Sequence, residues 1–207
     1  MFEPHDHFTR AAFDGSFRIA DRSTHPGEEL LDEKEAKKKL RKEVDKIDDL
    51  QRQLYAQNEW GVLLVFQAMD AAGKDSTIRA VTRGLNPAGF QVASFKQPSA
   101  EELDHDFLWR TAKRLPERGR IGICNRSYYE EVLVVRVHPE YLGGQRLPTM
   151  LQGEDLWEQR YASIRDHEAH LARNGTVVLK FWLNVSREEQ TRRFISRIDE
   201  PEKNWKF

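Results

Sequence analysis

Apolar positions repeat at helical spacing in the first third of the chain. From Glu28 to Glu59 they recur every three to five residues, which predicts one long amphipathic helix. Its apolar face could pack on the rest of the protein or on a second subunit, and the pattern fits both. Residues 1–27 show no clear period, and we expect an arm there. The apolar face comprises Leu31, Ala36, Leu40, Val44, Ile47, Leu50 and Leu54.

Short apolar runs alternate with helical patterns in the remainder of the chain. A first predicted strand begins at Val62, and others cover Phe90–Phe95, Arg120–Cys124 and Thr176–Val185. This alternation predicts an α/β fold with a parallel sheet covered on both faces. We therefore expect an arm and helix at 1–59 and an α/β domain at 60–207. Predicted helices cover Ser99–Leu115 with a Ser99–Glu102 capping box, Ser127–Val137, Glu154–Arg173, and a last helix opened by Ser186 and Glu189, with a connection at His138–Gly153.

The first strand leads into a phosphate-binding signature, since residues 62–77 read VLLVFQAMDAAGKDST. Small residues let backbone N–H groups converge on phosphate oxygens at a helix N-terminus, and Lys74 supplies a mobile ammonium. The signature departs from G-x-x-x-x-G-K-[ST] at Ala68 and at Asp75, which removes the hydroxyl that usually ligates Mg²⁺. Asp70 is then the candidate metal ligand. A plain tight turn is the alternative. The predicted phosphate contacts are Ala71, Ala72, Gly73, Asp75 and Ser76.

A second polar segment follows the third strand, where residues 125–131 read NRSYYEE. In a P-loop fold this position carries a second group that binds metal or phosphate. Arg126 could stabilise phosphoryl oxygens, Asn125 could hold a phosphate or a metal-bound water, and Glu130 could position the metal or the attacking oxygen. Ser127-x-x-Glu130 is also a capping-box pattern, so Glu130 could instead stabilise only a helix start.

Basic residues gather in two stretches. The first stretch is predicted to line a groove for a polyanion and contains Arg110, Lys113, Arg114, Arg118, Arg120 and Arg126. The second lies at 187–207, where a mobile lid would deliver arginines to a transferring phosphoryl group. A solvated helix paired with its acidic neighbours is the alternative there. This second stretch contains Arg187, Arg192, Arg193, Arg197, Lys203 and Lys206.

Composition excludes several other classes of function. The formal net charge is -1 with 32% charged residues, so no global field draws the protein to nucleic acid or to an acidic membrane. The single cysteine, Cys124, cannot form an intramolecular disulfide and is expected to be a small buried hydrophobe. The first thirty residues lack a signal-peptide pattern, and a cytoplasmic protein is expected. His167 and His170 lack convincing partners for zinc.

Three motifs in order resemble the polyphosphate kinase 2 family: Ala68–Asp75, Asn125–Glu131, and Arg193 through Phe207. The resemblance covers nearly the whole chain. It implies a three-layer P-loop kinase fold similar to thymidylate kinase, with an N-terminal helical extension and a C-terminal lid. It also implies inorganic polyphosphate as phosphoryl donor, Mg²⁺ as cofactor, and the branch that acts on both AMP and ADP. Family members carry further sheet and helix after the last motif, so a truncated C-terminus is expected.

The same resemblance implies roles for individual residues. Asp70 matches the loop carboxylate that organises Mg²⁺ and the acceptor phosphate, and Lys74 matches the phosphate-binding lysine. Asn125 and Arg126 match the second motif, which in many members begins with Asp. Glu130 matches an acidic residue that helps to accommodate the shorter acceptor. The lid residues that match are Arg193, Arg197, Lys203 and Lys206.

The predicted function is transfer of a phosphoryl group from polyphosphate to AMP or ADP, by a homo-oligomer that also binds ATP as product. One alternative is an ATP-dependent nucleoside monophosphate kinase, which shares the fold and the loop. A second is a P-loop switch or scaffold that signals through the long helix. The lack of an Asn-Lys-x-Asp segment weakens this second alternative.

Overall fold

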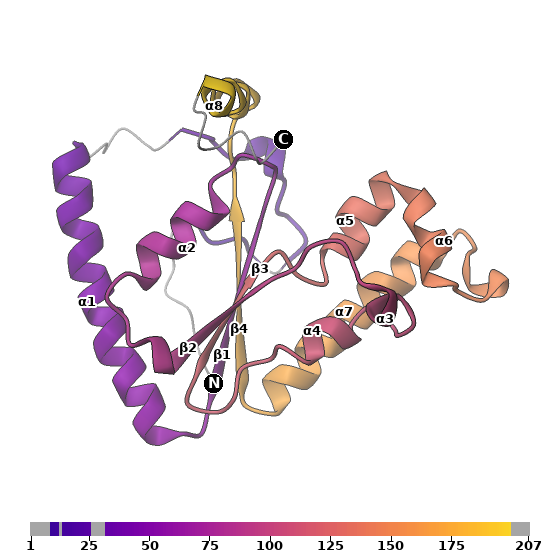
Figure 1. Cartoon of the computed structure of the whole chain (residues 1–207), viewed down its shortest axis with the longest axis horizontal. Coiled ribbons are helices and arrows are strands. Elements are labelled where there is room, and N and C mark those ends of the chain that lie inside the picture. The colour runs from indigo at the N-terminus through magenta and orange to yellow at the C-terminus, as the bar shows by residue number, and fades with distance from the viewer. Residues whose placement is uncertain (1–8, 13, 26–31, 200–207) are drawn as a thin grey trace. The chain divides into compact units, whose positions relative to one another are not determined.

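Four parallel strands form the centre of the structure, in the order β2-β3-β1-β4 (Figure 1). The structure is a computed structural model that describes residues 9–12, 14–25 and 32–199. Residues 1–30 form a separate unit, whose described part contains one short 3-10 helix, η1 (Ile19–Asp21). The second unit, from Leu31 onward, contains the sheet and all of the elements below.

The strand register brings the carboxyl ends of the strands to one edge of the sheet. Phe66 of β1 (Gly61–Ala68) is aligned with Asn125 of β3 (Ile121–Asn125) and with Phe181 of β4 (Thr176–Leu183). Asn125 is aligned in turn with Ser94 of β2 (Phe90–Ser94). The segments that follow β1, β2 and β3 therefore emerge side by side. The predicted parallel α/β sheet is confirmed.

Helices cover both faces of the sheet, which explains why β1 and β3 read as nearly continuous apolar runs. On one face Leu63, Val65 and Cys124 pack with Leu171 of α7. On the other face the core includes Ile78 of α2. The helices are α1 (Glu33–Gln57), α2 (Lys74–Thr82), α3 (Ala100–Leu103), α4 (Trp109–Ala112), α5 (Glu130–Val137), α6 (Leu142–Gln145), α7 (Leu156–Arg173) and α8 (Arg187–Asp199), with 3-10 turns η2 (Pro87–Gly89), η3 (Pro139–Tyr141) and η4 (Thr149–Leu151).

The long predicted helix is present as α1. Asp32 caps its start by accepting a hydrogen bond from the Glu35 N–H at 2.8 Å, and Asn58 ends it with a left-handed φ of 52°. Residues 28–31 of the prediction lie outside the described residues. Part of the apolar face packs on this domain, because Val44 is buried while Leu50 stays 61% exposed.

Two predicted helices differ from the structure. The helix expected at Ser99–Leu115 is interrupted between α3 and α4, because the Asp106 carboxylate accepts the Leu108 N–H at 2.9 Å in a local turn. The Ser99–Glu102 capping box itself is present. The helix expected from Ser127 begins only at Glu130, after a turn in which the Ser127 hydroxyl accepts the Tyr129 N–H at 3.2 Å.

Backbone and side chain meet closely where α1 crosses η2. The buried Gln51 side chain donates to the Asn86 carbonyl at 3.1 Å and accepts the Asn86 N–H at 2.9 Å. A Cβ at Gly89 would lie 2.6 Å from Gln51 Nε2, so a larger residue there would displace this amide. No helix in the described ranges has the length and apolar content that a membrane span requires.

A buried ion pair joins helices α5 and α7, and a side chain of α6 contacts it. Arg160 of α7 is 4% exposed and donates to Glu131 Oε2 at 3.0 Å and to the Glu131 carbonyl at 3.1 Å. Gln145 of α6 donates to the same carboxylate at 2.6 Å and accepts from Arg160. Each charged group thus has several partners, as burial requires.

Replacement of Glu131 by Ala should lower the free energy of unfolding by about 3–5 kcal/mol, because it leaves the Arg160 guanidinium buried without its counter-ion. Urea denaturation monitored by circular dichroism measures this change. Replacing both partners, as Glu131→Leu with Arg160→Met, should recover most of the loss. A Glu131→Ala midpoint equal to that of the unchanged protein would contradict this account.

Candidate active site

The phosphate loop, residues 69–73, connects the carboxyl end of β1 to the N-terminus of α2. Ala68 ends β1, and its φ angle is not positive. The first glycine of the usual motif is therefore not needed at this position. Gly73 has φ of 97°, and a Cβ on it would lie 3.2 Å from the Ser76 hydroxyl. Ala71 also has a positive φ, of 61°. The loop therefore stores backbone strain where ligands would bind.

Lys74 is the first residue of α2, and its side chain folds back over the loop. Its ammonium donates to the Ala68 carbonyl at 3.0 Å. Burial lowers the pKa of Lys74, and the charge of Arg126 lowers it further, while Asp70 and Glu130 oppose the shift. An anionic ligand at this position would stabilise the charged ammonium.

Arg126 connects the phosphate loop to the turn after β3. Its guanidinium lies 3.1 Å from Asp70 Oδ1 and 3.2 Å from Glu130 Oε2. The backbone N–H of Arg126 donates to the Phe66 carbonyl at 3.1 Å, and this hydrogen bond holds the turn against β1. The φ of Arg126 is 66°, a strained conformation for a long side chain. The structure thus brings together four predicted residues in one cluster of two cations and two carboxylates.

Two residues that depart from the usual motifs contact each other. The Asn125 amide donates to Asp75 Oδ1 at 2.6 Å. Asn125 ends β3, and Asp75 lies in the first turn of α2, where a carboxylate interacts favourably with the helix dipole. The pair therefore joins the carboxyl end of β3 to the first turn of α2.

Helix α8 lies against the phosphate loop through two side chains. Arg193 donates to the Ala71 carbonyl at 3.1 Å and to Glu189 at 2.6 Å, and Gln190 donates to the Asp70 carbonyl at 2.7 Å. Sequence reasoning missed Gln190, although its spacing of three residues from Arg193 places it on the same helix face.

The other predicted lid residues stay predictions. Arg197 lies within α8, and its side chain is outside the described part. Lys203 and Lys206 lie outside the described residues altogether.

The structure places Arg118, which was predicted to bind phosphate, away from the phosphate loop. Its guanidinium donates to the carbonyls of Glu59 and Asn174, which precede β1 and β4. This is the amino edge of the sheet, roughly 23 Å along the strands from the phosphate loop. Arg120, which donates to the Ala88 carbonyl, also stays near the start of β3. The first basic stretch runs past the sheet from one edge to the other, so it does not form one groove.

Arg114 lines a separate cavity of about 360 Å³ beside the edge strand β2. The other basic groups there are Lys96 and the buried Arg110, which donates to the Lys96 carbonyl at 2.8 Å. Phe95 donates its N–H to the Asn125 carbonyl at 3.1 Å, so one end of this cavity is next to the turn after β3. Lys96 belongs to none of the motifs found in the sequence, and it was therefore not predicted as a site residue.

A partly buried polar cluster anchors the turn after β3 to α7. The hydroxyls of Tyr128 and Tyr129 donate to Glu168 Oε1 at 2.9 and 2.7 Å, and Lys180 donates to Oε2 at 2.7 Å. Burial raises the pKa of both tyrosines, and the charge of Glu168 raises it further. Both rings are therefore structural supports, and Glu168 is a support that no local motif indicates.

Carboxylates at the site are few. Within the described ranges, no group of three or more His, Cys, Asp or Glu side chains is arranged to hold a metal ion. Asp70 is 69% exposed in its side chain and shares Arg126 with Glu130. A cation at this position would therefore need oxygen ligands from a substrate as well.

The fold and the loop are those of the P-loop kinase class. The sequence profile of the family Polyphosphate kinase 2 (PPK2) matches residues 30–207, so the chain belongs to this family, as the motifs predict. A crystal structure of Polyphosphate Kinase 2 from Arthrobacter aurescens TC1 has a TM-score of 0.84 and 35% identity, and the match covers 96% of this chain and 68% of that chain. The predicted fold class is confirmed.

Two curated relatives carry functional names. An ADP-polyphosphate phosphotransferase of Rhodopseudomonas palustris is 61% identical over 169 residues, which cover 81% of this chain and 58% of that protein. An AMP/ADP-polyphosphate phosphotransferase of Meiothermus ruber is 47% identical over 162 residues, which cover 78% and 57%. The chain thus spans a little over half the length of these relatives.

Cys124 lies one residue before Asn125, yet its environment opposes nucleophilic chemistry. It is 3% exposed, and burial raises the pKa of its thiol to about 12. Because the thiolate is the reactive form, alkylation by iodoacetamide at mildly alkaline pH should be at least about a hundredfold slower in the native protein than in concentrated urea. Mass spectrometry of timed samples measures both rates, and equal rates would contradict the burial of Cys124.

Proposed function

We propose that this chain carries the catalytic core of a polyphosphate-dependent nucleotide kinase. The observation that carries the proposal is the cluster of Asp70, Lys74, Arg126 and Glu130 at the N-terminus of α2, where a phosphoryl group would meet two cations. The names of the two curated relatives support polyphosphate as donor and AMP or ADP as acceptor. The proposed kinase domain is 60–207 with a lid near 187–207, preceded by the arm and helix at 1–59.

The reaction requires positioning more than proton transfer. An oxygen of the terminal phosphate of AMP or ADP forms the new bond to the terminal phosphorus of polyphosphate. The bond from that phosphorus to its bridging oxygen breaks, and the shortened polyphosphate leaves with the electron pair. The attacking oxygen is already anionic, so no general base is needed, and orientation and charge stabilisation carry the rate.

Each charged group at the site has a proposed role. Lys74 exchanges its contact with the Ala68 carbonyl for phosphate oxygens, and Arg126 stabilises the transferring group. Arg193 leaves the Ala71 carbonyl for a phosphate when the lid closes. The backbone N–H groups of the phosphate loop and of the first turn of α2 hold the remaining oxygens.

The residues present fit a Mg²⁺ ion, because Mg²⁺ in phosphotransfer sites takes one or two protein carboxylates together with substrate phosphates. Asp70 would hold the ion. Glu130, the second carboxylate that contacts Arg126, lies beside this arginine. The chemistry that Mg²⁺ would supply there is neutralisation of the negative charge on the phosphoryl oxygens. A cytoplasmic location and a homo-oligomeric assembly belong to the same proposal and rest on the sequence alone.

The direct test supplies long-chain polyphosphate and Mg²⁺ with AMP or ADP and no ATP, and follows nucleotides by chromatography. We expect ADP from AMP and ATP from ADP. Replacement of Lys74 or Asp70 by Ala should lower turnover by about 10²–10³-fold, because each removes a group that acts on the transferring charge.

The Lys42→Ala variant is the control, since it removes one exposed charge from α1 away from the site. It should retain the activity of the unchanged protein. Transfer that occurs only with ATP as donor would overturn the proposal in favour of an ATP-dependent nucleoside monophosphate kinase. Near-normal activity of either site variant would also contradict it.

A further inference from the structure

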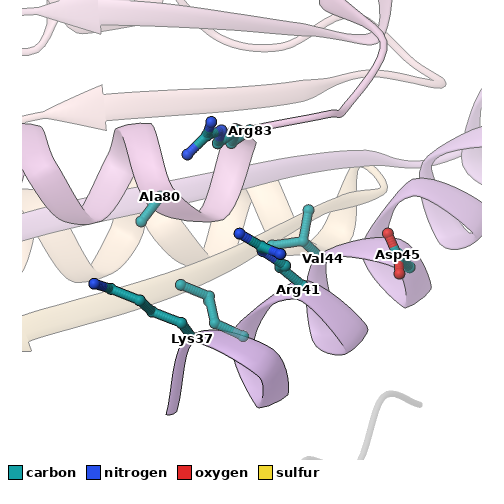
Figure 2. A pocket seen from close by; sticks show the side chains of 7 residues that line it. Lys37, Arg41, Val44, Asp45, Ala80 and Arg83 are labelled. Atoms are coloured by element: carbon teal, nitrogen blue, oxygen red, sulfur yellow. The ribbon is translucent and has the colours of Figure 1, made fainter. Parts of the chain in front are cut away.

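A second cationic surface lies between α1 and α2, in a cavity of about 560 Å³ (Figure 2). Of the seven side chains that line it, three are cationic, Lys37 and Arg41 from α1 and Arg83 after the end of α2. Asp45 is the one acidic side chain among them, and Figure 2 shows it at one end of the group. The lining therefore has an excess of two positive charges on a protein whose formal net charge is -1.

The remaining side chains that line this cavity are apolar. They are Leu40, Val44 and Ala80, and Val44 is buried. Such side chains support the aliphatic stems of long basic side chains while their charged ends stay in water. The lining contains no aromatic side chain on which a nucleotide base could stack. The cavity thus suits an anion that consists of charged groups without a ring.

The two arginines of the cavity form no ion pair with the described carboxylates, unlike some of the bases on α1. Lys37 pairs with Glu33, and Lys46 pairs with Glu43 at 2.9 Å. For Arg41 and Arg83, the described residues provide no carboxylate within salt-bridge distance. Like charges that line one cavity repel each other, and an anion between them would remove that cost.

Helix α2 connects this cavity to the phosphate loop. It begins at Lys74 and ends at Thr82, so Arg83 lies about 13 Å along the axis from Lys74. Arg79 and Arg83 are four residues apart and share one side of the helix. Arg79, in the last turn of α2, therefore adds an exposed basic group on the side that it shares with Arg83.

We propose that the cavity binds a distal part of the polyphosphate chain whose end reacts at the phosphate loop. This inference rests on the proposed function. Guanidinium groups bind phosphate oxygens through paired hydrogen bonds, and a linear polyanion is long enough to contact both places. A second contact on the same chain raises the effective concentration of its reacting end. Long polyphosphate should consequently bind better than short polyphosphate.

The test compares the double variant Arg41→Gln, Arg83→Gln with the matched control Lys39→Gln, Lys42→Gln, which removes two α1 charges that do not line the cavity. In the cavity variant the KM for long-chain polyphosphate should rise about tenfold. The kcat and the KM for tripolyphosphate should stay unchanged. The affinity for long chains should also depend less steeply on salt. The magnitude of the slope of log affinity against log salt concentration should decrease by about 1.4, as expected for two lost phosphate contacts.

Fluorescence anisotropy with labelled long-chain polyphosphate measures affinity without turnover, and thermal melting verifies that both variants fold. If the unchanged protein transfers no phosphoryl group from polyphosphate, the proposed function fails, while the anisotropy comparison still decides this inference. Equal affinities of the cavity variant and the control would overturn the inference. A change in the KM for AMP or ADP alone would overturn it too, because the cavity would then serve the nucleotide.

Discussion

The contact of Arg126 with two carboxylates from different segments is the interaction on which the site depends. Its guanidinium joins Asp70 of the phosphate loop to Glu130 of α5, and its N–H fixes the turn to β1. The left-handed conformation of Arg126 costs of order 1–3 kcal/mol, and these contacts offset it. Without them, the two halves of the site would be held by the sheet beneath and by the hydrogen bond from Asn125 to Asp75.

The parts of the site that follow strands could be predicted from the sequence. Apolar runs locate β1 and β3, and parallel strands place the residues after them at one edge. This is why Lys74, Asn125 and Arg126 were expected together and lie together. Helix boundaries were less predictable, because the Asp106 turn competes locally with the helix expected at Ser99–Leu115.

Sequence proximity does not give position in space, and this explains both the unexpected position of Arg118 and the residues that were not predicted. Arg118 is near Arg126 in the chain, yet its hydrogen bonds lie at the opposite edge of the sheet. Glu168 contacts Tyr129, which lies 39 residues away, and Gln190 contacts the Asp70 carbonyl, which lies 120 residues away, so no local motif indicates these contacts. Lys203 and Lys206 lie outside the described residues, and their roles stay predictions.

We propose that the phosphate loop and the turn after β3 act on the transferring group as one charged unit. A double-mutant cycle of Asp70→Ala and Arg126→Ala, read as kcat/KM with polyphosphate and ADP, tests this most directly. If the two residues act together, the double variant should be less than about tenfold worse than the more damaged single variant. If the two losses multiply, the residues act independently, and the account of the site is wrong.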